Sequence, residues 1–195
     1  MRRKIRFVQN GKVRELTDVD PTHTLLNFLR YDDAQTGSKE GCAEGDCGAC
    51  TVLLDGAPVC ACLTPLARAA GAEITTVTGL PDAALQASFQ RHGAAQCGIC
   101  TPGMLVAATA LLNRTAAPSR AEVVHALGGV LCRCTGYSKI IDAVLDAGAA
   151  LDQPLQPAAG QAVGAPIMRL DGGDKVSGRE IFGADYIPSD ALTVR

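Results

Sequence analysis

Eight of the nine cysteines in this 195-residue chain fall into two groups of four, and no other feature of the sequence restricts its fold as strongly. The first group begins with Cys42, Cys47 and Cys50 in the run GCAEGDCGAC, and its fourth member is Cys60 or Cys62. A C-x4-C-x2-C run with a distant fourth cysteine is the plant-type spacing of the ligands of a [2Fe–2S] cluster. The glycines in the run allow tight turns, so that several backbone N–H groups can point at the sulfurs.

The second group joins two short motifs that lie farther along the chain. Cys97 and Cys100 form a C-x2-C motif, and Cys132 and Cys134 form a C-x-C motif. Taken alone, this group fits structural zinc nearly as well as an iron–sulfur cluster. Its presence beside the first group favours a second [2Fe–2S] cluster.

Disulfides and zinc are the alternative uses of these cysteines. Disulfides require an oxidising compartment, whereas the basic N-terminus is not followed by the apolar run of a signal peptide. Zinc ribbons pair two C-x2-C motifs, and the four residues between Cys42 and Cys47 fit that pattern poorly. We therefore expect a cytoplasmic protein with reduced, cluster-binding thiols.

Composition excludes several classes of partner and describes the core. The formal net charge is −2 without a basic block, which argues against nucleic acid as a partner. No apolar stretch approaches the length of a membrane span. Without tryptophan, and with three tyrosines and four phenylalanines, the core must consist mainly of aliphatic residues. Two small cores, each stabilised by a cluster, would suit such a chain.

The first part of the chain has the pattern of strands. Two alternating stretches flank the turn Asn10-Gly11, a second pair flanks Asp55-Gly56, and residues 74–77 predict a further strand. Thr24 is the predicted cap of a short helix with apolar residues at 25, 26, 28 and 29. This pattern predicts a ferredoxin-like β-grasp domain at residues 1–79.

The pattern becomes helical after Pro81. The first predicted helix spans residues 83–92, and the second runs from a Thr101 cap, with Pro102 at the first helical position, to about residue 113. A third helix is predicted after the capping box of Ser119 and Glu122, and a fourth from Gly136 to about residue 151. They predict a four-helix bundle at residues 80–151, with the second cysteine group at helix N-termini, whose partial positive charge suits thiolates. A linker (152–165) and a tail (166–195) follow. The tail is predicted to be extended and non-helical. A strand-rich domain followed by a helical one gives the predicted fold class α+β.

Three motifs, at residues 39–52, 96–103 and 131–137, resemble the iron–sulfur component of the molybdenum hydroxylases, the xanthine dehydrogenase and aldehyde oxidase family. The resemblance covers residues 1–151. It implies one [2Fe–2S] cluster in each domain, a large partner subunit that binds molybdenum through a pterin, and usually an FAD-binding subunit. Residues 169–188 resemble the opening of the molybdenum-binding subunit, which leaves a split gene, proteolysis and truncation as explanations of the tail.

The resemblance also assigns roles to single residues. The family spacing selects Cys62 as the fourth ligand of the first cluster and leaves Cys60 as a small buried residue. The implied ligands are Cys42, Cys47, Cys50, Cys62, Cys97, Cys100, Cys132 and Cys134. Gln96 and Cys134 would lie beside the pterin of the partner, although Gln96 can also simply cap a loop. Arg133 can donate to a cluster sulfur or face solvent.

The resulting hypothesis is an electron-transfer subunit of a molybdenum-dependent oxidoreductase. Electrons would pass from the molybdenum centre to the helical-domain cluster, then to the ferredoxin-like cluster, and then to FAD or another acceptor. No Ser/His/Asp set or phosphate loop indicates bond-making chemistry in this chain. A purine such as xanthine is the favoured substrate of the complex, with an aldehyde or a nicotinate-like N-heteroaromatic as the alternative. A stand-alone ferredoxin-type carrier and a zinc-stabilised binding module are the rival functions.

Overall fold

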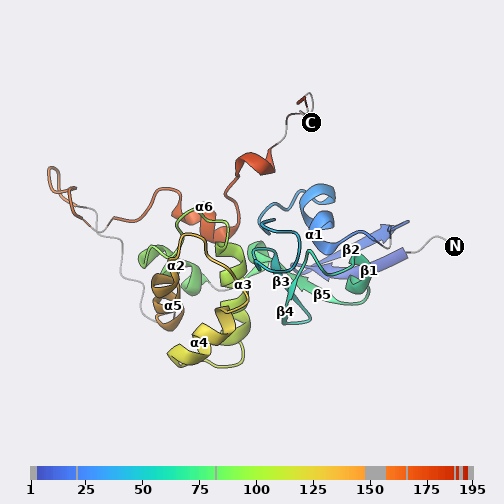
Figure 1. Ribbon diagram of the computed structural model, residues 1–195, viewed down its shortest axis with the longest axis horizontal. Coiled ribbons are helices and arrows are strands. Elements are labelled where there is room, and N and C mark those ends of the chain that lie inside the picture. The colour runs from blue at the N-terminus through green and yellow to red at the C-terminus, as the bar shows by residue number, and fades with distance from the viewer. Residues whose placement is uncertain are drawn as a thin grey trace.

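A five-stranded sheet and a group of helices lie side by side in the computed structural model, and the C-terminal segment crosses above both (Figure 1). The structure describes residues 4–20, 22–81, 83–147, 157–165, 167–186, 188 and 191–192. The sheet and the helices each have their own hydrophobic core. Within the described ranges, no helix is both long and apolar enough to cross a membrane.

Two hairpins and a joining strand form the sheet, in the order β2-β1-β5-β3-β4. The strands are β1 (Lys4–Gln9), β2 (Lys12–Thr17), β3 (Thr51–Leu54), β4 (Ala57–Cys60) and β5 (Glu73–Thr75). β5 pairs parallel to β1 and antiparallel to β3. Asn10-Gly11 and Asp55-Gly56 all have positive φ, between 49° and 78°, which matches the twist of a two-residue hairpin. Both predicted hairpins are confirmed.

A short helical segment covers this sheet. Helix α1 (Leu25–Asn27) is capped by the side chain of Thr24, as predicted, and continues into a π-helical turn (Phe28–Asp32). The ring of Phe28 meets the ring of Phe7 from β1 edge-on, with 5.7 Å between their centroids. Leu25, Leu26 and Leu29 are fully buried against the same sheet.

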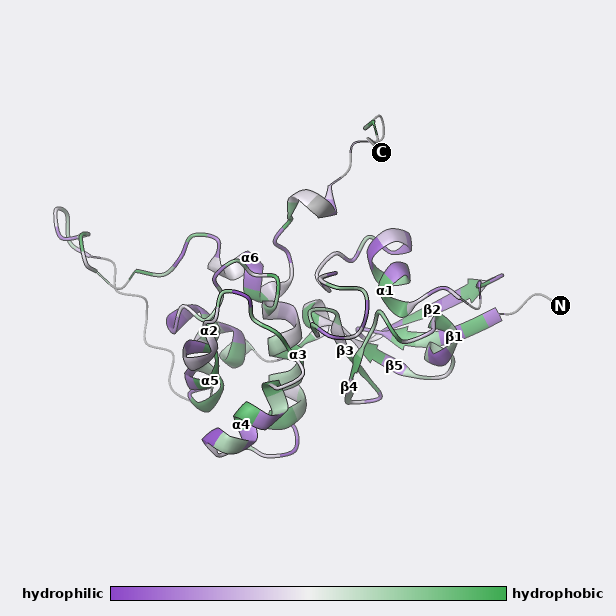
Figure 2. Ribbon diagram, viewed as in Figure 1, coloured by the Kyte–Doolittle hydropathy of each residue, from purple (hydrophilic) through white to green (hydrophobic). Residues whose placement is uncertain are grey.

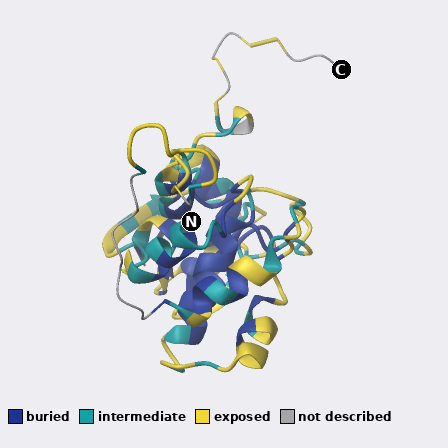
Figure 3. Cartoon of the chain, turned by 90° about the vertical axis from the view of Figure 1, so that its left-hand side faces the viewer, coloured by how far each residue is buried: buried dark blue, intermediate teal, exposed yellow. Residues whose placement is uncertain are grey.

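Four helices build the second half. They are α2 (Ala83–Arg91), α3 (Thr101–Leu112), α4 (Arg120–Leu127) and α5 (Tyr137–Leu145). Every residue of α3 except the last is buried, and it is the central helix, whereas the others expose hydrophilic faces (Figures 2 and 3). Ser119 and Glu122 form the predicted capping box of α4.

Three element boundaries differ from the sequence predictions. Helix α3 begins at Thr101 with Cys100 as its cap, because the backbone of Cys100 is already helical, so Thr101 is not the cap. The strand predicted over 74–77 ends at Thr75, since a 3-10 turn (Val77–Gly79) follows it. Helix α5 ends at Leu145, and the predicted end near Leu151 lies outside the described residues. Residues 157–165 are the part of the predicted linker that the structure describes, and most of them are exposed coil.

The prediction of a tail without helix was wrong. Residues Gly172–Ser177 form helix α6, which packs on α2 and α3, and Val176 is buried in the helical core. A 3-10 turn (Gly183–Asp185) follows and reaches the sheet half. The tail therefore lies on its own chain. Ile181 and Tyr186 of the tail are exposed.

Asp185 fixes the end of this tail to the sheet half. Its carboxylate accepts hydrogen bonds from Arg30 at 2.6 Å and from Lys39 at 2.9 Å, and all three side chains are at most 4% exposed. Burial alone would raise the pKa of Asp185, but the N–H of Phe182 and the two cations lower it below its usual value. The carboxylate is therefore held ionised between two buried cations.

Candidate metal centres

The first cysteine loop wraps backbone donors around a thiol. The N–H groups of Glu44 and Cys47 each lie 3.4 Å from the sulfur of Cys42. These N–H groups, that of Glu44 most strongly, lower the pKa of Cys42 to about 7. Gly45 and Gly48 have φ of 86° and 65°, which allows the loop to reverse direction around the sulfur. The loop thus stabilises a thiolate in the way that an iron–sulfur ligand requires.

Cys50 and Cys62 are the buried pair of the first site. Burial, and the neighbouring Cys62 thiol with which it hydrogen-bonds, raise the pKa of Cys50 to about 12. A buried thiol that ionises as reluctantly as that of Cys50 needs a cationic group to become a thiolate. An iron–sulfur cluster supplies that group, so the donor set fits it.

Cys60 lies beside this pair and competes with Cys62 for the same role. Strand β4 ends at Cys60, so Cys62 lies in the following turn and does not share a strand face with it. The thiol of Cys60 donates to the carbonyl of Gly45 at 3.6 Å, and it also contacts Cys50. Proximity alone does not separate the two, and Cys62 as fourth ligand stays a prediction.

The second site forms where two helices begin. Cys100 caps α3, Cys97 precedes it, and Cys132 and Cys134 lie in the loop before α5. Burial and the nearby Cys132 raise the pKa of Cys100, whereas the N–H of Cys97 lowers that of Cys134. Tyr137 accepts the N–H of Cys132 at 2.7 Å, which ties the second motif to the start of α5.

An unpartnered hydroxyl supports a cluster at the second site. The Oγ1 atom of Thr101, the residue after Cys100, is buried, and no atom among the described residues bonds to it. Buried hydroxyls ordinarily have a partner. A cluster held by Cys100 offers sulfur acceptors in this neighbourhood.

The cysteine thiols of each group lie next to one another. Cys42 neighbours Cys47, and Cys50 neighbours Cys60 and Cys62, whereas in the second group Cys97, Cys134, Cys132 and Cys100 form one chain of neighbours. Within the part of the chain that the structure describes, no three Cys, His, Asp or Glu side chains converge to hold one metal ion. A [2Fe–2S] cluster takes four cysteine ligands, two on each iron, and each group supplies that number.

The two sites meet at a backbone seam. The N–H of Leu131, the residue before Cys132, donates to the carbonyl of Cys47 at 2.9 Å. A side chain on Gly48 would overlap the carbonyl of Gly129, and one on Gly103 would overlap the carbonyl of Gly48. The sequence predictions missed the close approach of these two backbone segments, because its signal in the sequence is three glycines that lie far apart.

The residues predicted to face a pterin lie on an open edge of the second site. Gln96 and Cys97 are exposed, Arg133 beside them is exposed, and Cys134 is half-exposed. The side-chain amide nitrogen of Gln96 lies close to Gly136, and its backbone carbonyl accepts a hydrogen bond from Lys175 at 3.1 Å. The edge leaves room for a partner's group, and the roles of Gln96 and Cys134 stay predictions.

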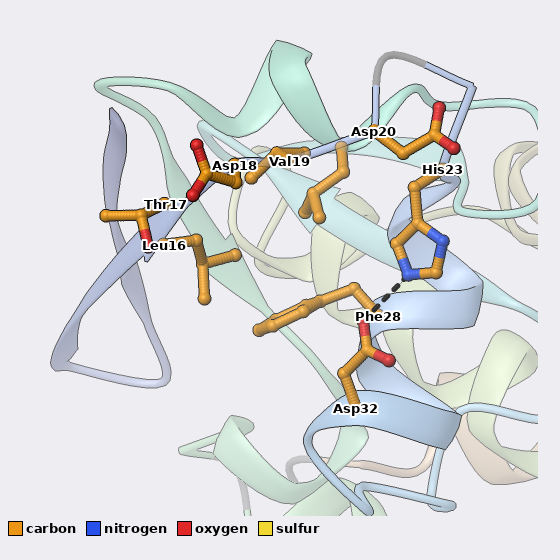
Figure 4. Close-up of a pocket in the computed structure, with 9 residues that line it drawn as sticks. Leu16, Thr17, Asp18, Val19, Asp20, His23, Phe28 and Asp32 are labelled. Carbon is orange, nitrogen blue, oxygen red and sulfur yellow. Dashed lines mark hydrogen bonds and ion pairs between the residues drawn. The ribbon is translucent and has the colours of Figure 1, made fainter. Parts of the chain in front are cut away.

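The histidines lie away from the cysteine sites. His23 lines a surface pocket beside β2, and its Nε2 atom donates to the carboxylate of Asp32 at 2.7 Å (Figure 4). His92 pairs with Asp146 at 3.0 Å, and His125 lies in the last turn of α4. His23 and His92 are half-buried, and His125 is exposed.

Two iron–sulfur family models match the chain. The model of the 2Fe-2S iron-sulfur cluster binding domain covers residues 7–76, and that of the [2Fe-2S] binding domain covers residues 76–145. The small subunit of nicotine 6-hydroxylase from Paenarthrobacter nicotinovorans is 52% identical over 141 residues, which are 71% of this chain and 85% of that subunit. The nicotinate dehydrogenase small FeS subunit from Eubacterium barkeri is 45% identical, over 69% of this chain and 88% of that subunit.

A further relative extends the match into the tail. The aldehyde oxidoreductase of Megalodesulfovibrio gigas is 40% identical over 185 residues, 86% of this chain and 20% of that protein. The crystal structure of the aldehyde oxidoreductase from Desulfovibrio desulfuricans ATCC 27774 superposes with a TM-score of 0.90 and 39% identity, over 97% of this chain and 23% of that chain. This chain thus spans about a fifth of the aldehyde oxidoreductases. It belongs to the family of iron–sulfur subunits of the molybdenum hydroxylases, with two [2Fe–2S] domains and a C-terminal segment that the aldehyde oxidoreductases also contain.

Proposed function

We propose that this chain carries electrons from a molybdenum–pterin centre in a large partner subunit to FAD in another subunit or to another acceptor. Support for the role comes from the family membership and from the two cysteine sites. We assign the first site to a domain at residues 1–79 and the second to a domain at 80–151. The open edge of Gln96 and Cys134 would face the partner that holds the pterin.

Eight of the cysteines are the proposed ligands. Cys42, Cys47, Cys50 and Cys62 would hold one cluster, and Cys97, Cys100, Cys132 and Cys134 the other. When bound, each [2Fe–2S] cluster accepts and releases one electron. The chain's own contribution is to donate backbone N–H groups to the thiolates, as at Cys42, and to bury Cys50 and Cys100. Such donors and burial set a cluster's potential.

The hydrogen bond from Leu131 to Cys47 is the observation that most directly supports transfer between the sites. It joins a ligand of the first site to the residue bonded to Cys132, a ligand of the second. The path therefore runs through backbone and one 2.9 Å hydrogen bond, without a gap of solvent. A stand-alone carrier with a single cluster would have no use for such a connection.

An N-heteroaromatic compound is the substrate class that we favour for the complex. Two relatives, of which the chain covers 85% and 88%, are named for nicotine and nicotinate. The purine that the sequence pattern favoured is also an N-heteroaromatic, whereas an aldehyde is a different class. The substrate is bound by the partner subunit, so this choice rests on similarity.

Substrate-driven reduction of the purified complex tests the proposal. Anaerobic addition of nicotinate or xanthine should bleach the visible iron–sulfur absorption, and benzaldehyde should have a weaker effect. The isolated chain is the control and should not respond to any of the three. Strong bleaching by benzaldehyde alone would overturn the substrate class, and failure to purify with a molybdenum-containing chain would overturn the electron-transfer role.

A further inference from the structure

A lysine from the tail lies on the loop that carries the second cysteine group. The side chain of Lys175, in α6, is 7% exposed, and its Nζ atom donates to the carbonyl of Gln96 at 3.1 Å. Gln96 is bonded directly to Cys97, a proposed cluster ligand. A buried ammonium group therefore lies one residue away from the second site.

Close packing fixes this lysine in place. Gly98 has a φ of 97°, and a Cβ atom there would lie 2.9 Å from Cγ of Lys175 and 3.1 Å from both Cδ of Lys175 and the ring of Phe182. The lysine stem and the phenylalanine ring thus lie directly on the backbone between Cys97 and Cys100. Gly98 is needed for this close approach, because any side chain would displace the tail.

The carboxylate that pairs with Lys175 is shared with a second cation. The ammonium group pairs with Asp171, which in turn accepts two hydrogen bonds from Arg169 at 2.9 and 2.8 Å. The three groups together carry one net positive charge. Lys175 is the buried member, whereas Arg169 and Asp171 are substantially exposed. Because solvent screens exposed charges more strongly, the field at the loop is dominated by Lys175.

We propose that Lys175 tunes the reduction potential of the helical-domain cluster. Reduction adds a negative charge to an already anionic centre, and a fixed buried cation close to it stabilises the reduced form more than the oxidised form. This inference rests on the proposed function, since it assumes a cluster on the second cysteine group. The tail would then have a role at the second cysteine site, because Lys175 lies in the tail and not in residues 1–147.

Potentiometric titration of the full chain, followed by the electron paramagnetic resonance signals of the two reduced clusters, tests this role. Lys175→Met should disfavour reduction of the helical-domain cluster about tenfold, a potential lower by about 59 mV for one electron. The ferredoxin-like cluster should keep its potential. Lys175→Arg should restore most of the shift, and Arg179→Met, which removes an exposed tail cation, should change neither potential.

The sign of a second substitution separates charge from disturbed packing. Asp171→Asn removes an anion at the same place, so it should raise the potential of the same cluster, whereas loosened packing would shift both variants in one direction. Equal potentials in Lys175→Met and the unmodified chain, or a lower potential in Asp171→Asn, would overturn the proposal. If the unmodified chain shows no [2Fe–2S] signals, the proposed function itself fails. If the Lys175→Met variant loses the helical-domain cluster, the potentials of that cluster in Asp171→Asn and Lys175→Arg decide whether the proposal stands.

Discussion

The two cysteine sites are built in different ways. Three cysteines of the first site lie within one nine-residue loop, where neighbouring N–H groups lower the pKa of Cys42 to about 7. The second site joins two motifs that lie far apart in the sequence and meet through the packing of helices α2 to α5 around one core, and burial raises the pKa of Cys100. The first site is therefore encoded mainly by local backbone geometry, whereas the second depends on the tertiary fold.

The largest expected effect separates Cys62 from Cys60 within the first site. Cys62→Ser should abolish or severely alter the ferredoxin-like cluster, because it removes a thiolate from the buried pair with Cys50. Cys60→Ser is the matched control, two residues away, and should leave the resonance signals of both reduced clusters in place. Loss of the cluster in Cys60→Ser, with its retention in Cys62→Ser, would show that the fourth ligand is Cys60.

A cavity in the helical core should lower the cluster occupancy of the second site more than that of the first. Leu105, in α3, is fully buried, and Leu105→Ala should destabilise the helical domain by about 2–5 kcal/mol. We expect reduced occupancy of the helical-domain cluster and a normal ferredoxin-like cluster, as measured by quantifying both resonance signals.

Leu145→Ala provides the control for this substitution, because Leu145 in α5 is 41% exposed. It should change neither signal. Equal loss of both clusters in Leu105→Ala would contradict the view that the first site forms from local structure.

A smaller, local effect is expected at the end of the tail that contacts the sheet half. Asp185→Asn leaves Arg30 and Lys39 buried without their counter-charge, which should weaken docking of the tail by about 3 kcal/mol. Limited proteolysis should then cut the tail faster while both clusters remain. Asp174→Asn, which breaks an exposed pair with Arg179, should leave the cleavage rate nearly unchanged. Equal cleavage of the two variants would show that the buried pairs do not hold the tail.

The local features were the predictable ones. The turns at Asn10-Gly11 and Asp55-Gly56 and the capping box at Ser119 each depend on residues a few positions apart, so the sequence pattern identifies them. The three cysteine motifs were visible for the same reason, whereas the meeting of Cys97 and Cys100 with Cys132 and Cys134 depends on the fold. The relative arrangement of the two sites was not predicted.

The tail and the seam were missed because distant contacts determine them. Helix α6 begins Gly172-Gly173, which have low helix propensity, and it forms because Val176 is buried in the helical core. Arg30 and Lys39 have charges that normally remain exposed, and their partner Asp185 lies more than a hundred residues away. The contact between Leu131 and Cys47 is a backbone hydrogen bond, to which side-chain patterns are insensitive.

Metal analysis of the purified full chain, combined with resonance spectra after dithionite reduction, tests the central claim most directly. Two complete sets of four cysteines predict about four iron atoms and as many acid-labile sulfides per chain. They also predict two distinct [2Fe–2S] signals, one from the local site and one from the helical site. About two iron atoms with stoichiometric zinc, or a single signal, would contradict the account of two clusters joined across the seam.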